Sequence, residues 1–182
     1  IDLYVSPTAT IRALRYGNTD IAKRGFNVSN ESSTFTVNGG RIILGRSTNG
    51  DLPDYEVNAG YGLGNINGAT LQLGDSSISV TNQDYKIAGT VALYNLHSVS
   101  PNSRTKISQQ NLHINNDWTI DENHEAFIED NTVYLGGNLL CSGTFNTNST
   151  ALTTDARQLV LSGSSNTQTI YNKNAPGIDI YN

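Results

Sequence analysis

The chain of 182 residues contains no methionine and one cysteine, Cys141. A single thiol cannot form an intramolecular disulfide or a cysteine zinc site, and its setting in the segment NLLCSG predicts a small buried strand residue. The absence of methionine predicts that Ile1 is not a translation start and that the chain is a fragment of a longer polypeptide. Neither feature indicates a catalytic thiol.

Positive charge is also scarce. The chain has 11 Lys and Arg against 16 Asp and Glu, with a net charge of -5 and a pI near 5.0, and its basic residues are scattered. A nucleic-acid-binding surface requires clustered basic residues, so we expect no nucleic-acid partner. No apolar run approaches the roughly 18 residues of a membrane-spanning helix, and no signal-peptide core is present. We therefore expect no membrane insertion.

Hydrophobic residues make up 36% of the chain, below the roughly 45–50% typical of globular domains on a broader count that includes glycine. Such a composition favours disorder when the charge is high, but charged residues are only 15% here. The apolar residues present are mostly β-branched or aromatic and occur in short alternating runs. An ordered chain with a thin hydrophobic interior is therefore expected.

Short alternating segments bounded by Gly, Asn or Ser predict an all-β fold. The predicted strand segments lie at 33–45, 69–81, 85–95, 131–137, 157–163 and 167–172. Segment 8–17 also alternates and is predicted as a strand, whereas 121–130 is compatible with two helical turns. Residues 46–68 form the longest irregular segment, which is typical of a functional loop.

A comparison of the chain with itself indicates a tandem duplication. The pair Gly39-Gly40 with its two following aliphatic residues matches Gly136-Gly137, and three further matches follow in the same order. The predicted units are 1–7, the tail of a preceding module; 8–100, a first β module with the long loop 46–68; and 101–182, a second β module or fibre shaft.

Each predicted module is too narrow to bury enough apolar surface alone, and the composition predicts that one chain has too few hydrophobic residues to cover its own interior. The stability of a module must come from stacking on neighbouring units of the same chain or from wrapping around other chains, and three chains around an axis would also cover exposed strand edges. The predicted interior positions are Ile42, Ile43, Leu71, Leu73, Val91, Leu93, Val133, Leu139, Leu140, Leu159 and Leu161.

The segment from Thr132 to Gly163 resembles the repeat typical of bacteriophage tail fibres, in which glycines flank a short apolar strand and a Thr- and Asn-rich strand follows. The resemblance implies an elongated, intertwined homotrimeric β-fibre built from β-helical or small β-sandwich modules. It also implies an extracellular location on the virion, other tail or baseplate proteins as partners, and attachment to a host cell-surface glycan or protein. The histidines are isolated, so an axial ladder of iron-binding His pairs is not expected.

The long loop combines tyrosine rings with amide and carboxylate groups, a mixture suited to sugars or a protein partner. The predicted receptor- or partner-binding residues are Asp54, Tyr55, Glu56, Asn58, Tyr61, Asn65 and Asn67. Packing of the loop tyrosines against a neighbouring chain is the structural alternative for the same residues.

An acidic cluster forms a second candidate site, consisting of Asp117, Trp118, Asp121, Glu122, Glu125, Glu129 and Asp130. Paired carboxylates with a sugar-stacking Trp are typical of glycoside hydrolysis, and closely spaced carboxylates also suit calcium. A transition-metal site at His124 and Glu125 is a further alternative. A solvated acidic turn explains the cluster more simply, so we expect no catalysis, no metal and no cofactor.

No nucleophile elbow, zinc-protease helix or phosphate-binding loop occurs in the sequence. The function that we expect is structural: a virion tail-fibre or spike component that attaches to the host surface without acting as an enzyme. Two alternatives remain open, a tailspike-like polysaccharide depolymerase and a bacterial surface adhesin or secretion-system fibre.

Overall fold

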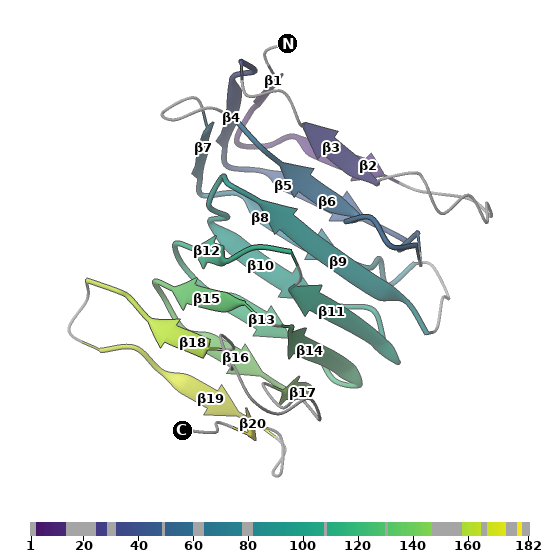
Figure 1. Cartoon of the computed structure of the whole chain (residues 1–182), viewed down its shortest axis with the longest axis vertical. Helices are drawn as coiled ribbons and strands as arrows, with labels where there is room; N and C mark the ends of the chain where they lie inside the picture. Colours follow the sequence, from purple (N-terminus) through teal and green to yellow (C-terminus); the bar gives the residue numbers. More distant parts are fainter. Residues whose placement is uncertain are drawn as a thin grey trace.

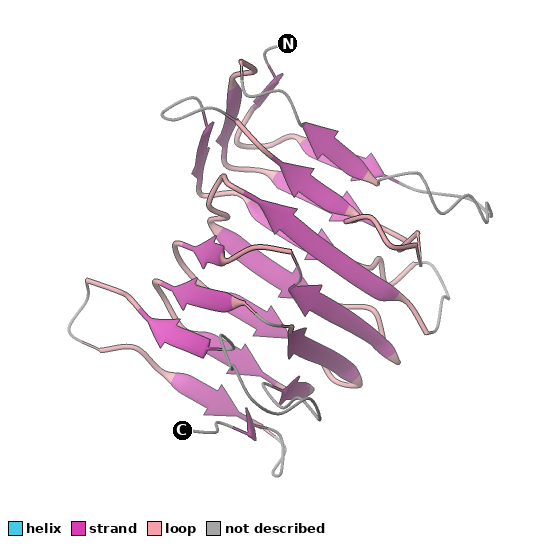
Figure 2. Ribbon diagram, viewed as in Figure 1, coloured by secondary structure: helices cyan, strands magenta, loops and turns pink. Residues whose placement is uncertain are grey.

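A computed structural model of the chain describes residues 3–13, 25–28, 32–48, 50–59, 64–77, 82–107, 109–129, 131–146, 158–164, 167–173 and 178–179. The described residues contain β-strands and no helix, which confirms the all-β prediction (Figures 1 and 2). The strands form two long sheets, which we call the front and back sheets, and two short side sheets.

The strands of the back sheet, in chain order, are β2 (Thr10–Ala13), β5 (Arg41–Leu44), β8 (Thr70–Leu73), β10 (Asn95–Ser98), β13 (Trp118–Ile120), β16 (Leu139–Cys141) and β19 (Ile170–Asn172). Those of the front sheet are β3 (Phe26–Val28), β6 (Tyr55–Val57), β9 (Asp84–Gly89), β11 (Ser103–Ile107), β14 (His124–Ile128), β17 (Thr144–Asn146) and β20 (Ile178–Asp179). One side sheet contains β1 (Leu3–Val5), β4 (Phe35–Asn38) and β7 (Gly64–Asn67), and the other contains β12 (Leu112–Ile114), β15 (Thr132–Leu135) and β18 (Gln158–Leu161).

The chain winds through these sheets as a parallel β-helix. Most coils place a side-sheet strand, a back-sheet strand and a front-sheet strand in succession, and every described strand pairing joins one coil to the next in parallel (Figure 1). Equivalent residues in the central coils lie 20 to 22 positions apart, as the register pairs Asp84 with Arg104 and Leu96 with Trp118 show. Each coil therefore stacks on its sequence neighbours, as in other solenoids.

Alternation along each strand places one set of side chains between the sheets. On the back sheet, Ile42, Leu71, Leu96, Trp118 and Leu139 follow one another in register as an inward column. All of these residues are at most 3% exposed. Such columns let a coil with only a few apolar residues contribute to one continuous core.

This core corrects one argument from the sequence. The inference that a single chain has too little apolar material to cover its own interior is wrong for the described residues, because stacking of coils buries a continuous cluster from Val5 to Phe145. Stacking on sequence neighbours, the first of the two alternatives, supplies the cover. The homotrimer therefore no longer follows from a shortage of hydrophobic residues.

Most of the predicted interior positions are confirmed, and two are wrong. Ile42, Ile43, Leu71, Leu73, Val91, Leu93, Val133 and Leu139 are buried, and Leu159 is partly buried against the core. Leu140 is 37% exposed because it points outward between two inward neighbours, and Leu161 is 41% exposed. The two helical turns considered for 121–130 are also wrong, since β14 occupies His124–Ile128.

The predicted boundary at residue 100 falls within continuous sheets. Strand β8 pairs with β10 and β9 pairs with β11, so both long sheets run across it. The pairs Gly39-Gly40 and Gly136-Gly137 each precede a back-sheet strand, whereas Leu71 and Leu159 lie in different sheets. Division into two modules thus remains a prediction about the sequence repeat.

Three asparagines form a ladder at the turn before the central front-sheet strands. Asn82, Asn102 and Asn123 have φ values of 57°, 52° and 62°, in the left-handed region that disfavours most side chains. The amide N–H of Asn82 donates to the carbonyl of Asn102 (2.8 Å), and that of Asn102 donates to the carbonyl of Asn123 (2.6 Å). Asparagine tolerates this backbone, so the ladder repeats the same bend in successive coils.

We expect Asn102→Gly to change the free energy of unfolding by less than about 0.5 kcal/mol, and Asn102→Val to lower it by about 1–2 kcal/mol, because a β-branched residue is strained at positive φ. Urea denaturation followed by circular dichroism measures both values. Asn65→Val is the matched control, since Asn65 is an exposed strand residue without a positive φ. Equal destabilisation by Gly and Val at position 102 would contradict the backbone argument.

Candidate functional site

An open polar pocket of about 550 Å³ lies on the front sheet where three strands begin. It is lined by Asn82, Gln83, Asp84, Asn102, Ser103, Arg104, Asn123 and Glu125. These residues come from the same positions of three successive coils, at the starts of β9, β11 and β14. The fold therefore repeats one short segment three times to make a single surface.

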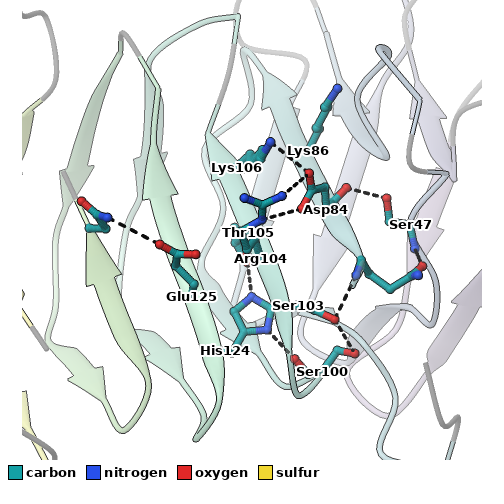
Figure 3. Close-up of polar contacts among 12 residues, drawn as sticks. Ser47, Asp84, Lys86, Ser100, Ser103, Arg104, Thr105, Lys106, His124 and Glu125 are labelled. Atoms are coloured by element: carbon teal, nitrogen blue, oxygen red, sulfur yellow. Dashed lines mark hydrogen bonds and ion pairs between the residues drawn. The ribbon is translucent and has the colours of Figure 1, made fainter. Parts of the chain in front are cut away.

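The pairing register explains which side chains face outward. Asp84, Arg104 and Glu125 are neighbours across the sheet, with Arg104 in the middle, and all three point away from the core (Figure 3). The residues before Arg104 and Glu125, Ser103 and His124, are buried. Adjacent parallel strands are about 4.8 Å apart, so equivalent groups recur at that spacing along the surface.

The charges of this row are largely paired within the protein. Arg104 donates from Nε and Nη2 to the two carboxylate oxygens of Asp84 at 2.7 and 3.0 Å, and Lys106 Nζ lies 2.9 Å from Asp84 Oδ2. Burial acts to raise the pKa of Asp84, but the hydrogen bonds and charges of Lys106 and Arg104 outweigh it and hold this pKa below its usual range. Asp84 is thus a carboxylate at neutral pH.

Glu125 occupies the other side of Arg104 and differs from Asp84. In the part of the chain that the structure describes, no ion pair joins it to a basic side chain, and its nearest polar partner is Asn146 Nδ2, 3.5 Å from Oε1. Arg104 and Lys106 are already occupied by Asp84, so Glu125 leaves the pocket with an excess of negative charge.

Ser47 and Thr48 are held by a buried carboxylate, that of Asp54. Asp54 accepts hydrogen bonds from Thr48 N (2.6 Å), Ser47 Oγ (3.0 Å) and Lys86 N (3.0 Å). Burial raises the pKa of Asp54, while these hydrogen bonds lower it in part. The amide of Ser47 also donates to Gln83 Oε1 at 3.1 Å, which ties this segment to the pocket lining.

The predicted loop site is divided by the fold. Asp54 and Tyr55 are each 1% exposed, so the prediction that they meet a partner is wrong: Asp54 anchors its own loop, and Tyr55 stacks on Phe26 at 5.6 Å inside the solenoid. Glu56 and Asn58 are partly exposed and hydrogen-bonded to each other. Asn65 and Asn67 are exposed on a side sheet, and Tyr61 lies outside the described residues.

The predicted acidic cluster is dispersed over several turns. Trp118 is fully buried and cannot stack on a sugar. Asp117 caps the next coil by accepting from Asn138 N and Nδ2, Asp121 pairs with His97 (3.0 Å), and Glu122 pairs with Lys173. Glu129 lies 3.7 Å from Lys106, and Asp130 lies outside the described residues.

Of this cluster, only Glu125 lines the pocket. The proposed metal pair of His124 and Glu125 is also excluded by geometry, because His124 faces the core and Glu125 faces outward. Among the described residues, no group of three or more His, Cys, Asp or Glu is arranged to hold a metal ion.

The sequence analysis missed the pocket residues, although a signal for them exists. The segments beginning at Asn82, Asn102 and Asn123 read NQDYKI, NSRTKI and NHEAFI, each an Asn with a charged residue two positions later and Ile five positions later. Comparison of the chain with itself at a spacing of 20 or 21 residues would have found this repeat. Glycine pairs and aliphatic runs, which mark the predicted duplication, do not coincide with this repeat.

The pocket offers amides, a hydroxyl and paired charges, and its geometry suits hydrogen bonding more than bond cleavage. Asp84 is held ionised by its basic partners, so it is a poor proton donor, and a general acid requires a raised pKa. No helix that could cross a membrane occurs among the described residues. Comparison with protein-family models, curated proteins and solved structures finds no match to this chain.

Proposed function

We propose that this chain is part of a virion tail fibre or spike and attaches to the host surface by binding an uncharged glycan in the front-sheet pocket. The observation that carries this proposal is the row of exposed asparagines, Asn82, Asn102 and Asn123, repeated coil by coil beside a row of charged groups. Amide groups at fixed spacing match the alternating hydroxyl groups of a sugar chain as donors and acceptors.

The charge distribution favours an uncharged ligand. Arg104 and Lys106 already bind Asp84, Lys86 Nζ donates to the carbonyl oxygen of Gly50, and Glu125 would repel a uronate, sialate or phosphate group. Asp84, which its basic partners hold ionised, is a poor general acid, and this favours binding without cleavage. A homotrimer, attached through other tail or baseplate proteins, would multiply a weak contact by raising the effective concentration of sites.

A glycan array of neutral and acidic oligosaccharides, probed with the purified chain, tests this function. We expect binding to neutral members and none to acidic members. Asn102→Gly removes one amide while keeping the backbone conformation, and it should weaken binding about tenfold, the value of roughly one to two hydrogen bonds. Asn38→Ala, which removes an exposed amide on a side sheet, is the matched control and should bind as the unaltered chain does.

Three results would contradict the proposal. These are binding restricted to acidic glycans, equal affinity of the Asn102→Gly variant, and release of new reducing ends from a bound polysaccharide. The last result would instead favour a depolymerase.

A further inference from the structure

A chain of hydrogen bonds runs through the core directly beneath the pocket. Trp118 Nε1 lies 3.4 Å from Ser98 Oγ, Ser98 Oγ lies 2.9 Å from Thr105 Oγ1, and Thr105 Oγ1 lies 2.8 Å from His124 Nε2. On the other side of the imidazole, His124 Nδ1 lies 2.8 Å from the carbonyl oxygen of Ser100. Ser98, Thr105, Trp118 and His124 are all at most 1% exposed, so none of these partners is readily replaced by water. Figure 3 shows the part of the network formed by Thr105, His124 and Ser100.

The groups at the two ends of this network, the Trp118 indole and the Ser100 carbonyl, determine which atom donates in each hydrogen bond. The indole N–H of Trp118 can only donate, and the carbonyl of Ser100 can only accept. His124 therefore carries its proton on Nδ1 and accepts at Nε2. The hydroxyl of Thr105 then donates to His124, the hydroxyl of Ser98 donates to Thr105, and Trp118 donates to Ser98.

Protonation of His124 is incompatible with this arrangement. A proton on Nε2 turns the imidazole into a donor at both nitrogens, so Thr105 must reverse and donate to Ser98. Ser98 then accepts from both Thr105 and Trp118, and its own hydroxyl hydrogen loses its acceptor in the chain. A buried charge and an unsatisfied buried donor arise together, and both are costly.

The groups around His124 give this charge little compensation. Tyr85 of β9 lies against the ring with a centroid separation of 6.5 Å, and its pKa is raised to about 12 by burial, so it stays neutral. Asp121, before β14, attracts a protonated His124, but it is already paired with His97 of β10, which repels one. Ser98, Ser100, Ser103 and Thr105 supply only neutral contacts.

The network is joined to the pocket through two turns. His124 stands between Asn123 and Glu125, which both line the pocket. Ser103 Oγ donates to the hydroxyl oxygen of Ser100 (3.2 Å). The backbone N–H of Gln83 donates to Ser103 Oγ (3.3 Å). Ser103 and Gln83 also line the pocket. Movement of His124 away from Ser100 thus displaces pocket residues contributed by all three coils.

We propose that the pocket is gated by pH: protonation of His124 opens the turns at 100–103 and 121–125 and so releases the bound glycan in acid. The release of glycan rests on the proposed function, whereas the opening of the turns does not. Burial lowers the pKa of His124 from 6.5 to about 4, more than the Ser100 hydrogen bond and Asp121 raise it, so the gate is closed at neutral pH.

The opening is tested without any ligand. Trp118 is the one tryptophan of the chain and ends the network, so its fluorescence reports the state of the hydrogen bonds. We expect a transition in its emission between about pH 6.5 and 4, together with at least tenfold faster amide exchange, corrected for the intrinsic pH effect, at residues 99–106 and 121–126. Residues 132–141 serve as the internal reference and should keep their protection.

His124→Gln is the matched variant, because its amide can donate to Ser100 and accept from Thr105 but does not titrate in this range. We expect it to lack both transitions. Identical acid transitions in the variant and the unaltered chain would overturn the proposal. NMR titration of the unaltered chain gives a second check that needs no substitution: a transition that precedes protonation of the His124 imidazole would also overturn it.

Release of the ligand is tested with the neutral oligosaccharide that gives the strongest signal on the glycan array. We expect its dissociation constant to about double between pH 7 and 4, the pH at which half of His124 is protonated, and to stay unchanged for His124→Gln. A parallel rise in both would show that pocket carboxylates, and not His124, control release. If no neutral glycan binds at pH 7, the proposed function is wrong. The fluorescence and exchange measurements still show whether protonation of His124 opens the two turns.

Discussion

Replacing Trp118 by alanine lowers the free energy of unfolding by about 3–5 kcal/mol, the largest effect expected for one substitution in this chain. The indole is fully buried in the back-sheet column between Leu96 and Leu139, with which it is in register. It also packs edge-on against Phe145 at 5.4 Å and 83°, and so bridges the back and front sheets. Alanine leaves a cavity that the flanking coils cannot fill, because their spacing is set by backbone hydrogen bonds.

Urea denaturation followed by circular dichroism measures the loss. Leu140→Ala is the matched control on the neighbouring strand, and it should cost less than about 1 kcal/mol because Leu140 is 37% exposed. Trp118→Phe should be intermediate, since it keeps an aromatic ring but loses the N–H that donates to Ser98. A cost below about 1 kcal/mol for Trp118→Ala would mean that the column is not the core of the folded chain.

Acidification from pH 6.5 to 4 removes about 3 kcal/mol of stability through His124, the second large effect. The pKa of this group is about 4 in the folded chain and 6.5 as a model value, so the unfolded chain binds the proton first as the pH falls. Each unit of difference corresponds to about 1.4 kcal/mol. The contribution is complete above pH 6.5 and is lost progressively down to about pH 4.

Chemical denaturation at pH 7.5, 6, 5 and 4 measures this dependence. The raised pKa of Asp54 acts in the opposite direction, because the folded chain then takes up that proton more readily than the unfolded chain. Asp84, with a lowered pKa, contributes only as the pH falls towards and below its model value of 3.8. The comparison with His124→Gln isolates the histidine, and a variant that loses as much stability as the unaltered chain would refute the assignment.

Strand prediction succeeded for the longer runs in which apolar and polar residues alternate. Segments 33–45 and 69–81 contain β4, β5 and β8 as expected. Strands β6, β12 and β13 were missed although their inward residues are apolar or aromatic, because each has only three residues and gives too short an alternating run. Strands β10, β11 and β14 were not predicted, because Ser98, Ser103, Thr105 and His124 occupy inward positions and interrupt the hydrophobic alternation. Those polar residues form hydrogen bonds with residues of the same network, in part between neighbouring coils. The sequence of one strand does not reveal such contacts.

The candidate site was likewise predicted only in part from the sequence. Glu125 was selected as an acidic residue, but Asp84, Arg104 and the three asparagines were not, because they are separated by about one coil of sequence. Conversely, Asp54, Tyr55 and Trp118 have the chemistry of a binding site, and burial assigns them to the interior. Residue type identified candidates, and the register of parallel strands decided which of them meet.

The sequence by itself determined the class of structure: β-branched and aromatic residues in short alternating runs, separated by Gly and Asn, specify strands and tight bends locally. It also indicated a repeating chain that must stack, because no short unit buries enough apolar surface alone. Only the tertiary structure decided that one chain provides its own core, and which polar residues share a face. Strand register aligns residues about 20 or more positions apart, and the energy that selects this alignment comes from contacts between coils, which no local stretch of sequence contains.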